Sequence, residues 1–211
     1  MVTVPKEVHT FGGRFSRDVH LIFSNPAEAV KVLIAEVDTP HALSVPLFVV
    51  ITAAIMTVIG KYLVFEVNQT IVGGPYWLQL LNSVFQGLAL TVDIIVTPIF
   101  LIFIWVFWAI VFHFLGSIVA GSDITGSGTF MKTLKLTGFI YAPMFLNILP
   151  ILPAKSLYVM PVVTTIWSAW IAYLAMKENY KTTRNGALII TLPYLFTAFY
   201  GAFVFLSRIG S

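Results

Sequence analysis

Residues 77–115, WLQLLNSVFQGLALTVDIIVTPIFLIFIWVFWAIVFHFL, form the stretch that decides the fold class of this chain. Its one charged side chain is Asp93, and roughly 20 mainly apolar residues are enough for a helix to cross a bilayer core of about 30 Å. Lipid offers no partner for unpaired backbone groups, so such a segment must be helical. The stretch therefore predicts a membrane-spanning helix. Its length requires a tilt, a kink at Pro98 or an interfacial first turn.

The composition of the whole chain points the same way. Of its 211 residues, 58% are hydrophobic and only 10% are charged, whereas a soluble domain carries about 25% charged residues. So few charges cannot cover a soluble surface, and much of this surface must face lipid. Cysteine is absent, which excludes disulfides and thiolate metal sites. We expect no cofactor, no metal and no nucleic-acid partner, and no secretory signal peptide in the polar first 40 or so residues.

Four further apolar stretches flank this segment. The runs do not alternate between polar and apolar residues, which argues against barrel strands. We therefore predict an all-α, polytopic bundle of five transmembrane helices in a membrane domain covering residues 43–207, with spans at about 43–65, 77–115, 134–152, 157–176 and 187–206.

Lys and Arg predict the orientation of the bundle, because positive residues are retained on the cytoplasmic side. Three of them fall on one side of the predicted membrane: Lys61, Lys155 and Arg208. Nine fall on the other: Lys6, Arg14, Arg17, Lys31, Lys132, Lys135, Lys177, Lys181 and Arg184. The N-terminus is therefore predicted inside and the C-terminus outside. Splitting the long second stretch into two spans would scramble this bias.

A short amphipathic helix is predicted at about 26–38, within a cytoplasmic segment covering residues 1–42. Asn25 fits an N-cap, Pro26 the first helical position, and Glu28 the reciprocal partner of a capping box. Apolar side chains recur at helical spacing beyond them, at Val30, Leu33, Ile34 and Val37. Such a helix lies on the inner membrane surface, packs on the cytoplasmic ends of the spans, or does both.

The second predicted span carries a polar stripe. At 100° per residue, its members fall within about 60° of one another: Asn82, Gln86, Asp93 and Thr97. Such a stripe faces the bundle interior, a second subunit or a watery cavity. It would serve as an ion or proton relay or as a ligand-gripping surface. Otherwise it forms hydrogen bonds between helices that set their packing.

Two further sets of side chains near the span ends are weaker candidates for a role beyond packing. His113 and Ser117 share a helix face, which raises the idea of hydrolysis, but no nucleophile elbow and no third orienting group accompany them. Tyr180, like Trp77 and Tyr158, fits an aromatic anchor at the membrane interface.

A glycine-rich loop followed by a distinctive run goes beyond generic membrane chemistry. Residues 121–130 read GSDITGSGTF, a basic-flanked Thr-Leu follows at 132–135, and 137–143 read TGFIYAP. This region resembles the signature between the second and third spans of the Yip domain family, the Ypt/Rab-GTPase-interacting membrane proteins. The matching positions are Gly126, Gly128, Phe130, Gly138, Tyr141 and Pro143, with Asn25 and Pro26 resembling that family's helix start before its first span.

The resemblance covers about residues 20–207 and implies five spans with an inner N-terminus. The long acidic and aromatic tail of eukaryotic members is absent, and their Asp-Leu-Tyr-Gly-Pro element is only echoed at 73–77, GGPYW. The chain is thus most similar to the short prokaryotic branch, which implies a prokaryotic plasma membrane. GTPase binding does not carry over with the resemblance.

Two functions follow from these features. The first is a non-enzymatic membrane protein that shapes membranes or scaffolds partners, using the amphipathic helix and the basic inner loops on anionic lipid. Its partners would be the bilayer, a cytoplasmic protein and further copies of the chain. The alternative is a small ion or solute transporter or channel, in which the stripe around Asp93 lines the path.

Overall fold

The computed structural model describes residues 10–36, 43–69, 76–121, 128–148 and 159–209. The described part of the chain is entirely helical, which confirms the all-α fold class. Its elements in chain order are α1 (Phe11–Ser24), α2 (Pro26–Ala35), α3 (Ser44–Gln69), α4 (Tyr76–Ala120), α5 (Phe130–Phe139), the 3₁₀ helix η3 (Ala142–Ile148), α6 (Val159–Asn179) and α7 (Arg184–Ile209).

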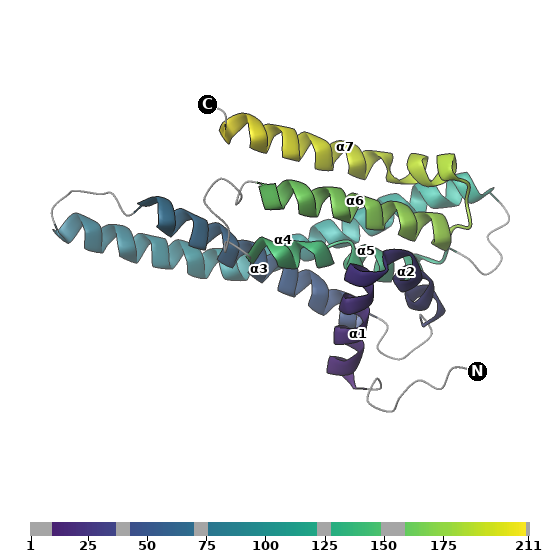
Figure 1. Ribbon diagram of the computed structural model, residues 1–211, viewed down its shortest axis with the longest axis horizontal. Helices are drawn as coiled ribbons and strands as arrows, with labels where there is room; N and C mark the ends of the chain where they lie inside the picture. The colour runs from purple at the N-terminus through teal and green to yellow at the C-terminus, as the bar shows by residue number, and fades with distance from the viewer. Residues whose placement is uncertain (1–9, 37–42, 70–75, 122–127, 149–158, 210–211) are drawn as a thin grey trace.

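The long helices run along one direction, and the two N-terminal helices gather at one end (Figure 1). We call this the capped end, where α2 packs on α5 and α6, and α1 contacts α2, α3 and η3. α1 runs across the direction of the long helices (Figure 1). The last turn of α7 points to the opposite end of the bundle. The chain therefore enters the bundle at the capped end and leaves it at the other.

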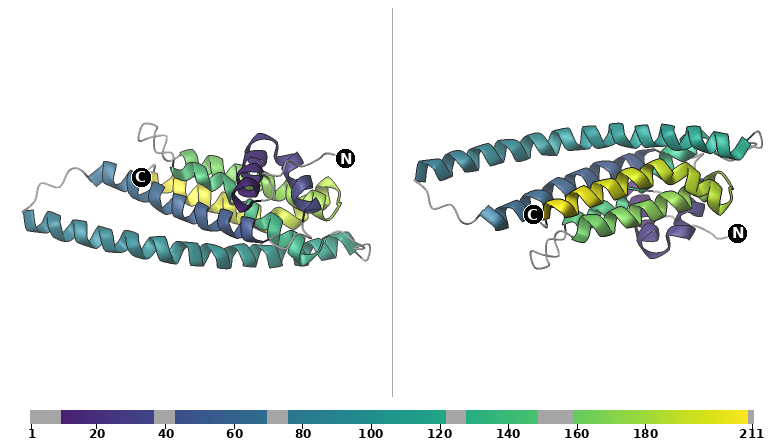
Figure 2. Two further views of the ribbon diagram at one scale, coloured as in Figure 1. Left: turned by 90° about the horizontal axis from the view of Figure 1, so that it is seen from below. Right: turned by 90° about the horizontal axis from the view of Figure 1, so that it is seen from above.

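α4 is a single helix, unbroken through Pro98. Its 45 residues measure about 67 Å at 1.5 Å per residue, which is more than twice a hydrocarbon core of about 30 Å. Figure 2 shows it extending well past α6 and α7. We call this extension, residues 76–97 with the facing residues 61–69 of α3, the arm. Large apolar side chains are exposed along the rest of α4 as well, among them Phe100, Phe103 and Phe107.

The third predicted span, 134–152, is not one continuous α-helix in the described residues. α5 ends at Phe139, a turn follows, and the chain continues as η3 through Pro143. Proline cannot donate a backbone hydrogen bond, so it favours a break of this kind. Every residue from Thr133 to Pro143 is buried, and α5 contacts α2, α3, α4 and α6. This element is therefore the central piece of the bundle.

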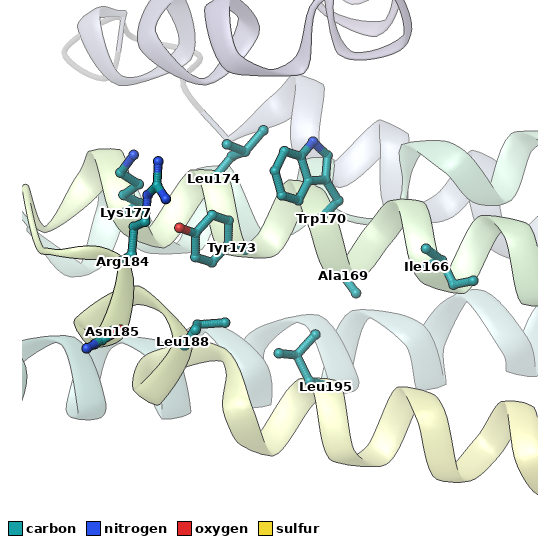
Figure 3. A pocket seen from close by; sticks show the side chains of 10 residues that line it. All are labelled: Ile166, Ala169, Trp170, Tyr173, Leu174, Lys177, Arg184, Asn185, Leu188 and Leu195. Atoms are coloured by element: carbon teal, nitrogen blue, oxygen red, sulfur yellow. The ribbon is translucent and has the colours of Figure 1, made fainter.

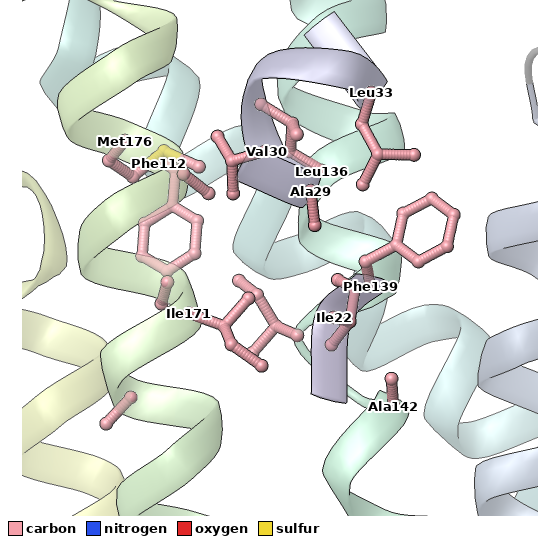
Figure 4. Close-up of a cluster of buried hydrophobic side chains, with 14 of the residues drawn as sticks. Ile22, Ala29, Val30, Leu33, Phe112, Leu136, Phe139, Ala142, Ile171 and Met176 are labelled. Atoms are coloured by element: carbon pink, nitrogen blue, oxygen red, sulfur yellow. The ribbon is translucent and has the colours of Figure 1, made fainter. Parts of the chain in front are cut away.

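The main hydrophobic core lies at the capped end, between α2, α5 and α6 (Figure 4). Val30 and Leu33 of α2 pack there, with each side chain almost wholly buried. From the central helix and its partners come Leu136, Phe139, Ile171 and Met176, and from α4 comes Phe112. The core fixes α2 against the bundle.

Of the two arrangements predicted for the helix at about 26–38, the packing of α2 matches the one in which the helix lies on the ends of the spans. α2 is shorter, ending at Ala35, and its apolar face is covered by protein rather than lipid because Val30 and Leu33 lie in the core. A second helix, α1, precedes it and was not predicted. Phe11 of α1 is 45% exposed. Its ring makes an edge-to-face contact with the exposed Phe48 of α3, with the ring centroids 5.4 Å apart. The amphipathic helix with an uncovered apolar side chain is therefore α1.

Two helical stretches in the described part of the chain are long and apolar enough to cross a membrane, Ser44–Tyr62 and Ser83–Ala120. The ends of α3, α6 and α7 lie within a few residues of predicted spans. Large apolar side chains are exposed on α7 too, at Leu192, Phe196 and Phe203. A surface of this kind is suited to lipid, and the number of crossings stays a prediction.

Candidate functional site

Asn25 and Pro26 build the corner between α1 and α2. The backbone N–H of Asn25 donates to Leu21 and closes α1, while its side-chain Oδ1 accepts from the N–H of Glu28, 3.3 Å away, and opens α2. Its Nδ2 donates to the Glu28 carboxylate at 2.9 Å. Pro26 occupies the first helical position. The predicted helix start is thus confirmed, although Glu28 meets the side chain of Asn25 rather than its backbone N–H.

A cluster of charged side chains ties this corner to the central helix. Arg17 donates two hydrogen bonds to Glu36, at 2.8 and 2.6 Å, and two to Asp18 Oδ1, at 2.9 and 2.7 Å. Asp18 is 3% exposed and Lys135, on α5, is 4% exposed. The charge of Lys135 also acts on both carboxylates. Buried charges of this kind persist only when they are paired, so the cluster holds α1, the end of α2 and α5 in one arrangement.

The pKa values of the two carboxylates in the cluster shift in opposite directions. Burial raises the pKa of Asp18, and the hydrogen bonds and charge of Arg17 offset only part of that effect. Burial also raises the pKa of Glu36, but Arg17 and Lys135 outweigh it and hold the pKa below its usual value. The hydrogen bond to Glu36 is the largest influence on Arg17 and raises its pKa. Arg17 therefore stays charged and serves as the hub.

A second polar cluster centres on Tyr180, just beyond α6. Its hydroxyl lies 2.8 Å from Thr133 Oγ1 on α5 and 3.0 Å from His113 Nδ1 on α4. Asn179 Nδ2 donates to the same Thr133 oxygen at 2.9 Å, and that oxygen lies within hydrogen-bond reach of the carbonyl of Thr129. Burial raises the pKa of Tyr180 to about 12, so the hydroxyl keeps its proton.

Two proton arrangements fit these distances. If Thr133 donates to Thr129, Tyr180 donates to Thr133 and accepts from His113 Nδ1. If Thr133 donates to Tyr180 instead, Tyr180 donates to His113 Nδ1. The chain of hydrogen bonds joins α4, α5 and α6 at the capped end. Tyr180 is buried in the cluster, which corrects its prediction as an interfacial anchor.

Gly128, one of the predicted motif residues, is explained by this tyrosine. Its φ is +83°, and a Cβ added there would lie 2.6 Å from the Tyr180 ring. A side chain is thus excluded both by the backbone and by the ring. Phe130 follows two residues later, with its ring 5.6 Å from that of His113. Gly126 lies outside the described residues.

The remaining motif residues pack around the break in the third element. A Cβ on Gly138 would lie 2.6 Å from Pro46 Cβ, so glycine lets α5 approach α3 closely. Tyr141 is buried in a second core with Trp105 and Leu134, and Trp105 donates to the Leu134 carbonyl at 2.8 Å. Pro143 is buried in η3. These four positions of the motif, Gly128, Gly138, Tyr141 and Pro143, are therefore contact points between helices.

The conserved-family model for the Yip1 domain matches residues 20–206. The chain belongs to the Yip1 domain family. Yip1 members are polytopic membrane proteins and generally non-enzymatic, so this Yip1-domain chain is a multi-pass membrane protein. Comparison with curated proteins and with solved structures gives no match.

His113 and Ser117 are not arranged as a nucleophile–base pair in this Yip1-domain protein. Ser117 donates to the backbone carbonyl of His113 at 2.8 Å rather than to its ring, and the ring nitrogen faces Tyr180. A nucleophile–base pair is therefore not formed by these two residues. No cluster of three or more potential metal ligands occurs among the described residues.

The polar stripe on α4 is only partly assembled. Asp93 makes an ion pair with Lys61 of α3 at 2.9 Å and accepts a hydrogen bond from Tyr62 at 3.2 Å. Thr97 is half-buried one turn further along. Asn82 and Gln86 lie on α4, but their side chains fall outside the described residues. The ion pair neutralises the carboxylate that a conducting path would need, which favours packing between α3 and α4.

Sequence reasoning missed three partners that the structure supplies: Lys61 for Asp93, Lys135 for Asp18 and Glu36, and Tyr180 for Gly128. The signal for the first was present, because a lysine close to the end of one span often neutralises an acid in the next. The others join residues more than 50 positions apart, and no local pattern in the sequence marks them.

Proposed function

We propose that this chain is a non-enzymatic, five-span protein of a prokaryotic plasma membrane, with its N-terminus inside, that shapes the membrane at its cytoplasmic face. The proposal rests on the cap, by which we mean α1 and α2 together. Two helices lie at one end only, α1 runs across the bundle, and Phe11 is left uncovered beside Phe48.

The orientation has support beyond charge counting. Of the basic residues predicted to lie inside, Arg17 belongs to α1, Lys135 to α5 and Arg184 to the start of α7, and these parts of the chain lie at the capped end. α1 and the last turn of α7 lie at opposite ends of the bundle, as an odd number of crossings requires (Figure 1). The chain contains no cysteine, so single cysteines at Lys31 and Ser211 can be labelled from each side of intact cells. Labelling of both from the same side would overturn the topology.

The cap would act as a wedge in one leaflet. A helix that lies in the interface displaces lipid there to a depth of about 5–10 Å, and α1 adds cross-section at the capped end alone. The Arg17 cluster holds α1 in place, because detaching α1 would break the Arg17–Glu36 ion pair and leave Lys135 buried on α5 without the nearby charge of Asp18. A rigid cap transmits its shape to the bilayer, whereas a tethered helix would not.

Reconstitution into vesicles tests the proposal. We expect the wild-type protein to lower the mean vesicle diameter measured by cryo-electron microscopy, and Phe11→Ser together with Arg17→Gln to restore the diameter of protein-free vesicles. Phe196→Ser is the matched control, because it removes an exposed phenylalanine from α7, away from the cap.

A partner-holding role is the other outcome of this experiment. If wild-type protein leaves vesicle diameter unchanged, membrane shaping is wrong. A photo-crosslinker at His20, which is exposed on α1, would then be expected to capture one cytoplasmic protein, and Arg17→Gln to abolish that capture.

Transport by way of the α4 stripe remains the alternative function. It requires Asp93 to face a water-filled path, whereas its carboxylate is engaged by Lys61 and Tyr62. Solute or ion flux in proteoliposomes that is abolished by Asp93→Asn would establish transport in place of the proposal above.

A further inference from the structure

A groove of about 690 Å³ runs between α6 and α7 at the capped end and is used by neither the cap nor the polar clusters. Its lining changes character along its length. Lys177, Arg184 and Asn185 line the end nearest the α6–α7 turn, and apolar side chains line the rest, including Ile166, Ala169 and Leu195 (Figure 3). The polar end of the groove therefore suits the headgroup of a lipid, and the apolar trough suits an acyl chain.

The two cations of the groove are available to a ligand. Among the described residues, neither Lys177 nor Arg184 makes an ion pair with a carboxylate of the protein. Glu178, the neighbouring acid on α6, does not line the groove. Figure 3 shows both cationic side chains at the same end, on adjacent helices. Two unpaired cations at one point suit an anion such as a phosphate diester.

The dimensions match one leaflet. The stretch of α6 from Ile166 to Lys177 rises about 17 Å, close to half of a hydrocarbon core of about 30 Å. Trp170 and Tyr173 form the wall in between, stacked with ring centroids 5.6 Å apart. Aromatic side chains of this kind concentrate at the level of the headgroups, which places the cations at the membrane surface.

We infer that this groove binds one anionic phospholipid of the leaflet at the capped end. Its phosphate lies between Lys177 and Arg184, and one acyl chain follows the apolar trough past Leu188 towards Ile166. A free phosphate would leave the trough unused, and a helix of a partner protein would leave the two cations without a counter-charge. Basic pockets between transmembrane helices on the cytoplasmic side are suited to anionic headgroups.

Native mass spectrometry of the detergent-solubilised full chain tests this inference, with phosphatidylglycerol and phosphatidylcholine added in turn. We expect one tightly held phosphatidylglycerol and weaker binding of phosphatidylcholine. The double variant Lys177→Gln, Arg184→Gln should weaken phosphatidylglycerol binding about 30-fold, since two basic contacts are lost. The control Lys31→Gln, Lys181→Gln removes two exposed cations that do not line the groove and should leave binding within about twofold of wild type.

The apolar part of the groove has its own pair of variants. Leu188 and Leu192 are both exposed on α7, but only Leu188 lines the groove. Leu188→Gln should weaken phosphatidylglycerol binding about fivefold by removing acyl-chain contact, and Leu192→Gln should not.

Three outcomes would overturn the inference. One is an equal loss of binding in both double variants, which indicates attraction to surface charge alone. The second is displacement of the lipid by glycerol 3-phosphate at comparable concentration, which indicates a phosphate site without an acyl chain. The third is equal binding of the two lipids. The experiment reads binding to a groove outside the cap, so its result is independent of the vesicle-shape experiment on Phe11 and Arg17.

Discussion

The capped end and the arm are both built from α-helices, but they differ in which side chains they bury and which they expose. At the capped end, polar side chains are buried and joined to partners: Arg17 to two carboxylates, and Tyr180 to α4 and α5. Along the arm, apolar side chains such as Phe85 and Ile95 are exposed. The described arm residues carry one ion pair, Lys61–Asp93, in which Lys61 is 68% exposed.

The difference shows where structural specificity lies in this molecule. Apolar contact with lipid tails does little to fix one helix against another, because lipid is as apolar as leucine. Buried hydrogen bonds and paired charges do fix it, because breaking one leaves an uncompensated polar group. The capped end should therefore be sensitive to single substitutions, and the arm should tolerate them.

Arg17→Gln should have the largest effect. It leaves the buried carboxylate of Asp18 without its partner, and removing one member of a buried ion pair costs about 3–5 kcal/mol. We expect this loss in the stability of cap attachment, measured as faster hydrogen exchange across α1 and α2 in detergent. Arg14→Gln is the control, because it removes the same charge from α1 without breaking an ion pair in the described residues. Equal exchange in the two variants would show that the cluster does not hold the cap.

Gly128→Ala should come next. The alanine must adopt a positive φ and must also displace the Tyr180 ring, and backbone strain alone costs about 1–2 kcal/mol. We expect a total of about 2–3 kcal/mol, measured by thermal unfolding in detergent.

Gly121→Ala separates the two contributions to that cost. Gly121 also has a positive φ, of +66°, but no atom lies within 4 Å of the added Cβ. It should therefore show the backbone strain without the clash. The same loss at both glycines would mean that contact with Tyr180 is not what requires Gly128.

Tyr180→Phe tests the hydrogen-bond chain with a smaller expected effect. It keeps the ring against Gly128 but removes the hydroxyl that links His113 and Thr133, at a cost of about 1–2 kcal/mol. Tyr173→Phe, on the more exposed surface of α6, should cost little in the same thermal unfolding assay. If Tyr180→Phe were as stable as Tyr173→Phe, the hydrogen bonds of the Tyr180 hydroxyl would not contribute to the stability of the capped end.

Asp93→Asn should have the smallest effect. Its partner Lys61 is largely exposed and Asp93 is 32% exposed. Asparagine keeps an oxygen that accepts hydrogen bonds from Lys61 and Tyr62, so we expect a loss of about 0.5–1 kcal/mol. A double-mutant cycle with Lys61→Gln measures the coupling directly. A coupling energy as large as the loss expected for Arg17→Gln would show that the arm is held as firmly as the capped end.

The local features of the fold could be predicted from the sequence because they repeat or occur within a few residues. Apolar runs of about 20 residues marked the long helices, and the alternation expected of strands was missing. Asn25, Pro26 and Glu28 marked a helix start over four residues, and the structure confirms it. The glycine-rich run and the following aromatic-proline element indicated the family, which the Yip1 domain match over residues 20–206 bears out.

Tertiary structure decided which of these features meet. The sequence predicted an amphipathic helix at about 26–38, but only packing determined that α5 and α6, rather than lipid, cover Val30 and Leu33. It contained Gly128 and Tyr180 without joining them across 52 positions. The physical reason is that periodicity and capping depend on neighbours along the chain. Contacts between distant helices depend instead on how their buried polar groups find partners.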